Sequence, residues 1–356
     1  MGDVKVTVWL STYNQEPYVA QALDSILMQK TDFPFEIIAA DDCSTDRTQE
    51  IILDYQKRYP GKIITFFPDH NLGGCRKLTD CIDLGLFRGE YLSYLEGDDY
   101  WLDEKRLQTL VDFLEVNPSY SRVSHRRNVI DQDGRDTGFD IPDDVLGKPF
   151  TIEDFLAGKN YSDFGGVFRN YFKQCGSKYH ELFWASRNVL DFQDMFITQD
   201  YGPVFVMDAV YGVYRSISTV GAQNYNSITP IAKRRRESIQ IAQTIETFYK
   251  GKYDLSPLIR RDRLRLLSLA IETQDVGEFA RLREEIPLHQ RKEMLAEIIY
   301  LARRGKRDHE LGFLNNQMIA EEKKGLYLLI AHYTVWRIKN KLTGTRPNDR
   351  LRGYVR

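Results

Sequence analysis

Apolar and polar residues alternate in blocks over the first hundred positions, and these blocks predict a sheet with helical crossovers. Four short apolar runs, each followed by a polar cluster, predict strands at residues 4–10, 35–40, 62–67 and 90–95. Three segments between them carry apolar residues at helical spacing, at 17–29, 46–58 and 76–87. This alternation predicts a mainly parallel α/β sheet that binds ligands at the carboxyl ends of its strands.

Polar motifs follow each of the four predicted strands. They read STYN at 11–14, DDCSTD at 41–46, NLGG at 71–74 and EGDDYW at 96–101. Because the carboxyl ends of parallel strands meet at one edge of a sheet, we expect these motifs to lie close together.

In this order and at these spacings, the motifs resemble the nucleotide-sugar half of inverting glycosyltransferases of family 2, which have the GT-A fold. The resemblance extends to about residue 228, because FQDMF at 192–196, Tyr214-Arg215 and Gly221 are similar to the acceptor-side half of the family. It implies a Rossmann-like mixed, mainly parallel sheet flanked by helices. It also implies transfer of a sugar, with a UDP-sugar as the favoured donor, to a glycan hydroxyl in surface or capsular polysaccharide synthesis.

The resemblance assigns the donor site residue by residue. Asp42 would accept from the uracil imide, Tyr13 would stack on the base, and Arg215 would neutralise charge on the leaving diphosphate. The full set expected to bind the nucleotide sugar is Thr12, Tyr13, Asn14, Asp42, Asn71, Gly74, Glu96, Asp98 and Arg215. The alternative for the cluster at 41–46 is an Asx-turn and N-cap for the next helix.

Three carboxylates lie within four residues at Glu96, Asp98 and Asp99. They repel one another unless a cation or donors neutralise them, and Gly97 lets the backbone approach a ligand. Mg²⁺ and Mn²⁺ prefer oxygen ligands, and a diphosphate supplies further ones. We therefore expect either metal at Asp98 and Asp99. Glu96 stands where the family more often has Asp, and a solvated acidic turn is the alternative.

The segment FQDMF supplies the candidate for chemistry. Inverting transfer needs a carboxylate that takes the acceptor hydroxyl proton, without a covalent enzyme intermediate. The match to the family motif assigns this role to Asp194. Asp191 is the competing candidate, and a helix N-cap is the structural alternative for it.

Charge divides the chain into two regions, although the net charge is only −2. Residues 1–231 carry 22 Lys+Arg and 35 Asp+Glu, and residues 232–356 carry 27 and 16. We therefore expect a glycosyltransferase domain at 1–231 and a basic α-helical region at 232–356, where segments such as 261–273 and 292–304 have helical periodicity.

The basic region has three interpretations. Its charges could form solvated helix faces, or the segment 326–342 with the basic tail behind it could bind an anionic membrane surface. Nucleic acid is not expected, because no recognised motif accompanies the charge and the acidic first region would repel phosphate. The third interpretation is contact with a partner protein or a second copy.

Composition limits where in the cell we expect the protein. The four cysteines form no C-x-x-C pair, and no run of 18 apolar residues occurs, so we expect a cytoplasmic enzyme, with attachment at the inner face of the membrane left open. A rival function is a non-catalytic nucleotide-sugar or glycan binding protein of the same fold. Retention of Asp42, Asp98, Asp99 and Asp194 argues against this rival.

Overall fold

The computed structural model describes residues 4–157, 159, 165–216 and 229–342. The chain divides into two compact units, Met1–Thr229 and Pro230–Arg356, and each is described by itself.

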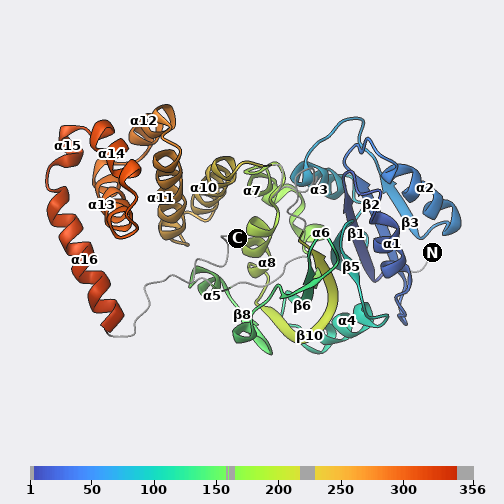
Figure 1. Ribbon diagram of the computed structural model, residues 1–356. Coiled ribbons are helices and arrows are strands. Elements are labelled where there is room, and N and C mark those ends of the chain that lie inside the picture. The colour runs from blue at the N-terminus through green and yellow to red at the C-terminus, as the bar shows by residue number, and fades with distance from the viewer. Residues whose placement is uncertain (1–3, 158, 160–164, 217–228, 343–356) are drawn as a thin grey trace. The chain divides into compact units, whose positions relative to one another are not determined.

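A single mixed sheet organises the first unit (Figure 1). Its strands in chain order are β1 (Val6–Thr12), β2 (Phe35–Asp41), β3 (Ile63–Phe66), β4 (Tyr91–Glu96), β5 (Tyr100–Trp101), β6 (Arg122–Ile130), β7 (Asp136–Phe139), β8 (Lys148–Phe150), β9 (Val167–Arg169) and β10 (Val204–Arg215). In space they run β3-β2-β1-β4-β9-β6-β10-β5, with β7 beside β6 and β8 beside β10. The four strands expected from the amino-terminal pattern are therefore present and adjacent.

Strand directions confirm a mixed, mainly parallel sheet. The strand β1 is parallel to β2 and β4, β2 is parallel to β3, and β10 is parallel to β6. The short strand β9 is antiparallel to both β4 and β6, and it joins the two halves. The first strand ends two residues later than expected, so Ser11 and Thr12 are part of the ladder.

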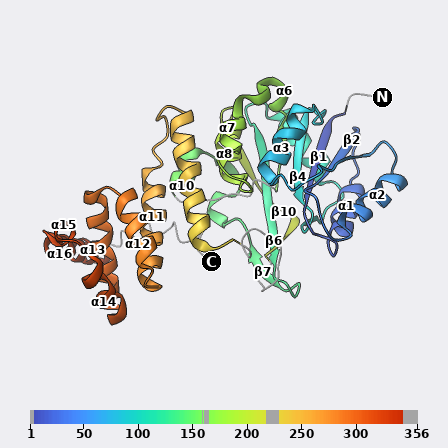
Figure 2. The same ribbon diagram turned by 90° about the horizontal axis from the view of Figure 1, so that it is seen from above.

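Helices cover both faces of this sheet (Figures 1 and 2). One face carries α1 (Val19–Leu27), α2 (Thr48–Arg58) and α4 (Arg106–Val116), whose apolar residues share a core with β1, β2 and β4. The other face carries α3 (Gly74–Asp83), α6 (Phe172–Cys175), η2 (Gly176–Tyr179), α7 (His180–Phe183) and α8 (Asp191–Gln199). Two short elements complete the unit, η1 (Asp143–Val145) and α5 (Ile152–Leu156).

The second unit is built from helices alone within its described residues. They are α10 (Ile231–Phe248), α11 (Ser256–Glu272), α12 (Val276–Glu285), α13 (Leu288–Arg304), α14 (Asp308–Gln317), α15 (Ala320–Lys323) and α16 (Leu326–Leu342). Their buried aliphatic and aromatic residues form one core, which runs from Leu266 to Ile330. The expected carboxyl-terminal helical region is confirmed. No helix in the described part of the chain has the length and apolar character needed to cross a bilayer.

Candidate active site

The ladder brings polar residues from three strands to one edge of the sheet. Thr12 on β1 lies opposite Asp41 on β2, and Ser11 lies opposite Glu96 on β4. The Thr12 hydroxyl donates to Asp41 at 2.8 Å. The motifs at 11–14, 41–46 and 96–101 therefore meet at the carboxyl ends of β1, β2 and β4, as the strand pattern predicts.

Two acidic residues of the DDCSTD motif have structural roles. Asp41 is fully buried and accepts hydrogen bonds from the Ser44 backbone N–H at 2.8 Å and the Gln49 side chain at 2.7 Å. Asp46 accepts from the Thr48 N–H at 3.0 Å, in the first turn of α2. The Asx-turn and cap alternative therefore describes the contacts of these two side chains.

Asp42 shapes the loop that carries the NLGG motif. One of its carboxylate oxygens accepts from the Leu72 N–H at 2.7 Å, and the other accepts from the Gly73 N–H at 2.9 Å. The Asn71 side chain donates to the Asp42 carbonyl at 2.9 Å. A carboxylate has about four lone-pair sites, so these bonds leave capacity for a further donor. Gly74 lies at the start of α3, where its N–H donates to Asn188 at 3.3 Å.

Tyr13 and Asn14 lie where β1 ends. Asn14 adopts a φ of +52°, its N–H donates to Ser44 at 2.8 Å, and its side chain accepts from the Thr45 N–H at 2.8 Å. These bonds fix the turn beside Tyr13. The Tyr13 ring is half-buried, and it has no hydrogen bond or ring contact among the described residues. An aromatic face of this kind is available to a planar ligand.

The two aspartates in the turn after β4 differ in burial, since Asp98 is half-buried and Asp99 is buried. A Cβ on Gly97 would lie 2.1 Å from Gln15 Oε1 and 2.6 Å from Thr12 Cγ2, so this close approach requires glycine. Asp98 is half-buried, and no other described residue donates a hydrogen bond to its carboxylate. Desolvation raises the pKa of Asp98. Asp98 is therefore the carboxylate that is open to a cation.

Asp99 is buried and fully engaged with protein donors. The Arg127 guanidinium on β6 donates to one oxygen at 2.9 Å, and the Arg215 backbone N–H on β10 donates to the other at 2.9 Å. Arg127 also donates to Asp140 at 2.8 Å and lies 4.7 Å from the centre of the Tyr214 ring. Burial alone would lower the pKa of Arg127, but Asp140 and Asp99 together raise it. Both carboxylate oxygens of Asp99 therefore accept from protein donors in this structure, whereas the motif suggested a metal ligand at this position.

Glu96 and Lys77 both lie beside Ser11 at this edge of the sheet. Burial raises the pKa of Glu96 to about 8, with a further contribution from Asp98, and the Lys77 ammonium opposes the rise. Lys77 is buried on α3, where it donates to the Ser11 hydroxyl and the Thr12 carbonyl, both at 3.1 Å. The Lys77 ammonium therefore lies near the carboxylates of Asp41, Asp42 and Glu96, although it forms no ion pair with any of them. A positive charge at this distance reduces the repulsion between the carboxylates.

Arg215 extends from the end of β10 over the same edge. Its guanidinium lies 4.8 Å from the centre of the Tyr18 ring and 5.3 Å from that of Tyr100. It donates to Gln21 at 2.5 Å. Its charge is among those that lower the pKa of Asp98 against desolvation, so the two side chains are close. Gly221, which belongs to the same family segment, lies outside the described residues.

The two candidate bases differ sharply in environment, although both lie in the first turn of α8. Asp194 is 1% exposed, and its carboxylate accepts from Arg122 at 2.5 Å and from the Tyr171 hydroxyl at 2.6 Å. Asp191 is an exposed residue, and desolvation raises its pKa. Desolvation raises the pKa of Tyr214 to about 12, and the negative charges of Asp99, Asp98 and Asp191 add to this rise, which indicates that all three carboxylates lie near the Tyr214 hydroxyl. Asp191 therefore faces the carboxylate edge, and Asp194 faces the core.

The donor set fits a divalent cation only in part. Across the described residues, no group of three or more His, Cys, Asp or Glu side chains is arranged to hold a metal ion. Mg²⁺ and similar ions are commonly bound by one or two carboxylates together with substrate phosphates. The open Asp98 carboxylate beside Glu96 fits that arrangement, in which the ligand supplies the remaining oxygens.

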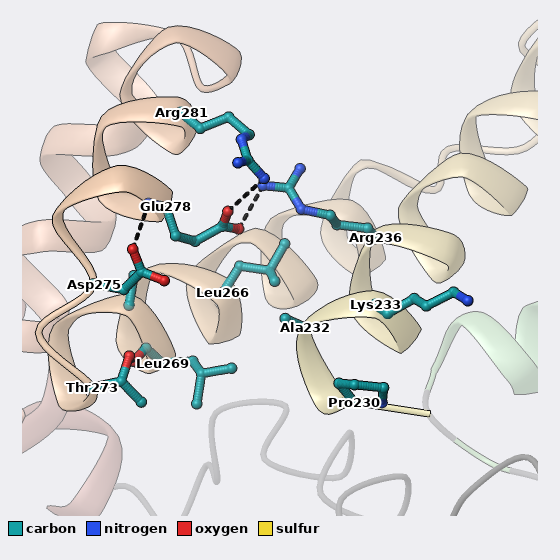
Figure 3. Close-up of a pocket in the computed structure, with 11 residues that line it drawn as sticks. Pro230, Ala232, Lys233, Arg236, Leu266, Leu269, Thr273, Asp275, Glu278 and Arg281 are labelled. Atoms are coloured by element: carbon teal, nitrogen blue, oxygen red, sulfur yellow. Dashed lines mark hydrogen bonds and ion pairs between the residues drawn. The ribbon is translucent and has the colours of Figure 1, made fainter. Parts of the chain in front are cut away.

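A separate pocket of about 440 Å³ lies in the helical unit, between α10, α11 and α12 (Figure 3). Its charged residues are engaged with one another, since Glu278 accepts from Arg236 at 2.5 Å and from Arg281 at 3.0 Å. Asp275 caps α12 through the Glu278 N–H. Leu266 and Leu269 line the pocket with apolar surface (Figure 3). These contacts hold the helices together and give the pocket no chemistry related to the carboxylate edge.

Sequence reasoning missed three charged residues of the site: Lys77, Arg122 and Arg127. Arg122 and Arg127 lie on β6, a segment to which the sequence analysis assigned no site residue, and Lys77 lies in a predicted helix. A strand that carries three arginines, one of them fully buried, is unusual, because buried arginines need partners. That composition is the signal that could have identified them.

Comparison with known proteins identifies relatives for the first unit. Residues 7–175 match the model of the family described as glycosyl transferase family 2. The Mycobacterium tuberculosis protein Rv1520 is 42% identical over 123 residues, which is 35% of this chain and 35% of that protein. The Staphylococcus aureus poly(ribitol-phosphate) β-N-acetylglucosaminyltransferase TarS is 32% identical over 119 residues, or 33% of this chain and 20% of TarS. The matched region thus spans about a third or less of these relatives.

The solved structures extend the likeness in fold. The S. aureus TarS fragment 1–349 in complex with UDP-GlcNAc has a TM-score of 0.58 at 17% identity, and the match covers 88% of this chain and 93% of that one. At this identity the similarity shows a common fold. It confirms the expected GT-A architecture followed by helices.

The first prediction separates Asp194 from Asp191 by stability. Asp194→Asn leaves the buried Arg122 guanidinium without its counter-charge, and we expect it to lower the free energy of unfolding by about 3–5 kcal/mol. Asp191→Asn should cost about 0.5–1 kcal/mol, the value of a weakened first-turn interaction. Urea unfolding of both variants checks this, and equal losses in the two would contradict the assigned environments.

The second prediction concerns the pair of Asp99 and Arg127. Arg127→Gln leaves the buried Asp99 carboxylate without its counter-charge and should cost about 3–5 kcal/mol of unfolding free energy, whereas Asp99→Asn leaves the half-buried Arg127 paired with Asp140 and should cost less. The double variant removes both charges and should lose less than the sum of the single losses by at least about 1 kcal/mol. Additive losses in this double-mutant cycle would show that the pair is not coupled.

Proposed function

The amino-terminal unit of this chain belongs to glycosyl transferase family 2, and we propose that the chain transfers a sugar from a nucleotide-sugar donor to a glycan hydroxyl with inversion. The favoured donor is a UDP-sugar. The observation that carries the proposal is the open Asp98 carboxylate at the sheet edge, where the motifs that contain Tyr13, Asp42 and Glu96 meet.

The donor half of the site divides its tasks among short loops. Tyr13 offers an aromatic face to the base, and Asp42 retains acceptor capacity for its N–H group. Thr12, Asn14, Asn71 and Gly74 support these two residues by fixing the loop backbones, as their hydrogen bonds indicate. Arg215 supplies positive charge for the diphosphate.

A divalent ion, Mn²⁺ or Mg²⁺, would be held by Asp98 together with the diphosphate, with Glu96 adjacent. When bound, it neutralises charge that develops on the leaving diphosphate. Asp99 is assigned a different task in this proposal. Its bonds to Arg127 and to the Arg215 N–H hold the 96–99 turn and the end of β10 together, which keeps Asp98 and Arg215 in position.

For proton removal we propose Asp191, which was the competing candidate in the sequence analysis. A general base must reach the acceptor hydroxyl, and Asp191 is accessible whereas Asp194 already accepts from Arg122 and Tyr171. The raised pKa of Asp191 brings its basicity closer to neutral pH, which favours proton transfer. Asp194 then acts by anchoring α8 against β6 and so orients Asp191.

The acceptor is proposed to be a polysaccharide or its lipid-linked precursor. TarS, by its name, glycosylates a poly(ribitol-phosphate), and similarity to this relative supports a surface polymer as the acceptor class. Cytoplasmic activity at the inner face of the cell membrane and an oligomeric form belong to the same proposal. The alternative, a binding protein without activity, is disfavoured because no other described residue donates a hydrogen bond to the carboxylate of Asp98 or of Asp191, the two groups that catalysis would use.

The third prediction tests donor binding. In a thermal-shift series with UDP-, GDP- and dTDP-sugars, a UDP-sugar with Mn²⁺ at a hundred times its Kd should stabilise the chain by about 2.7 kcal/mol. EDTA should remove most of this shift. Asp98→Asn should also remove it without lowering the melting temperature of the free chain, and a metal-independent shift that survives in this variant would overturn the role of Asp98.

The fourth prediction tests the base. Asp191→Asn should reduce sugar transfer by about 10²–10⁴-fold while donor affinity holds and the melting temperature falls only slightly. The matched comparison is Asp194→Asn, where any loss of transfer should track the loss of stability and recover at lower temperature. Near wild-type transfer by Asp191→Asn with its configuration unchanged would place the base elsewhere.

A further inference from the structure

Helix α16 exposes an unusual surface for a helix of a folded unit. Its exposed positions recur with helical spacing and form a single stripe, which we call the α16 stripe: Tyr327, Leu328, Ala331, His332, Val335 and Trp336. Four of these are large apolar or aromatic side chains, with exposed fractions of 78% for Tyr327, 77% for Leu328, 64% for Val335 and 41% for Trp336. His332 is the one polar member. A solvated helix normally turns charged residues outward, whereas the exposed positions between 326 and 337 carry no Lys, Arg, Asp or Glu.

The opposite face of α16 is fixed to its own unit. Leu326 and Ile330 belong to the buried core, and the Tyr333 hydroxyl donates to Glu297 on α13 at 2.9 Å. The ring of Tyr333 also meets that of Tyr300, with centres 5.2 Å apart. The helix therefore has a packed face and an unpacked one, and the stripe is not surface left by a loosely placed helix. Figure 1 shows α16 beside α13 in this unit.

Positive charge surrounds the stripe. The sequence from 323 to 342 contains five Lys or Arg residues and no Asp or Glu, and Lys323 and Lys324 are exposed at its start. The Arg303 guanidinium on α13 lies 5.8 Å from the centre of the Tyr327 ring, and Arg304 beside it is exposed. An apolar stripe flanked by cations complements a surface that is apolar below a layer of anionic groups.

We propose that the α16 stripe and its flanking cations form a docking surface for an anionic lipid bilayer, on which the helix lies parallel to the membrane plane. The stripe spans ten residues, or about 15 Å, which suits burial at the interface and is far too short for the hydrocarbon core. A second copy of the chain fits less well, because a symmetric contact through this stripe would bring the same cations face to face. The membrane contact itself does not depend on the proposed function. Only its purpose rests on that function, namely to bring the site to a lipid-linked acceptor.

The experiment is co-sedimentation of the full chain with vesicles. Phosphatidylcholine vesicles containing phosphatidylglycerol should bind the chain, vesicles of phosphatidylcholine alone should bind it weakly, and added salt should reduce the difference. Leu328→Ser with Val335→Ser should weaken binding to the anionic vesicles by about tenfold or more. Lys324→Gln and Arg304→Gln should each weaken it by about fivefold.

Exposed controls keep the test interpretable. Val276→Ser changes an apolar residue that is 52% exposed on α12 of the same unit, and it should leave vesicle binding unchanged. All substituted positions are exposed, so melting temperatures should hold. Equal binding by the stripe variants and the wild type, or no binding to anionic vesicles at all, would overturn the inference.

Size measurements without lipid supply a further outcome. If the wild type is a dimer in solution and the Leu328 and Val335 double variant is a monomer, the stripe is an interface between copies and the membrane proposal is wrong. The readout does not depend on catalysis. Failure of vesicle binding with an intact UDP-sugar thermal shift would therefore reject the docking surface alone, and the reverse result would reject the proposed donor.

Discussion

The ion pair between the buried Asp99 and the half-buried Arg127 joins the two halves of the sheet at the edge where the other site residues meet. Asp99 follows β4, which belongs to the half with β1, β2 and β3, and Arg127 lies on β6, in the half with β10. The second oxygen of Asp99 accepts from the backbone of Arg215, so the end of β10 is held by the same carboxylate. A charge in this position is stable only if it is fully paired, and the geometry of the edge therefore depends on the pair.

This constraint explains how one acidic turn can serve two purposes. Adjacent carboxylates at Asp98 and Asp99 would repel if both faced the same solvent pocket, but Asp99 is neutralised from behind by Arg127. Asp98 is left half-buried and open. The same division of labour occurs in α8, where Asp194 is neutralised by Arg122 and Asp191 stays accessible. In both places an arginine from β6 fixes one buried aspartate and so positions its neighbour.

The sequence predicted the frame of the molecule well because the frame depends on local periodicity. Short apolar runs ending in polar clusters identified β1 to β4, and the parallel arrangement then required their loops to share an edge. The division within the acidic pairs could not be predicted in the same way. Asp191 and Asp194 lie in the same turn of one helix, and the residue that distinguishes them, Arg122, is 72 positions away. Partners so distant in sequence become visible only after β6 and α8 have packed.

The central claim is that Asp98 and Asp191 face a bound nucleotide diphosphate, while Asp99 and Asp194 keep their ion pairs with Arg127 and Arg122. A crystal structure of the chain soaked with UDP and Mn²⁺ tests it most directly. The account predicts the uracil ring against Tyr13, the metal between Asp98 and the diphosphate, and the Asp99–Arg127 and Asp194–Arg122 pairs unbroken. Metal coordinated by Asp99 with Arg127 displaced, or UDP bound away from the carboxyl ends of β1, β2 and β4, would contradict it.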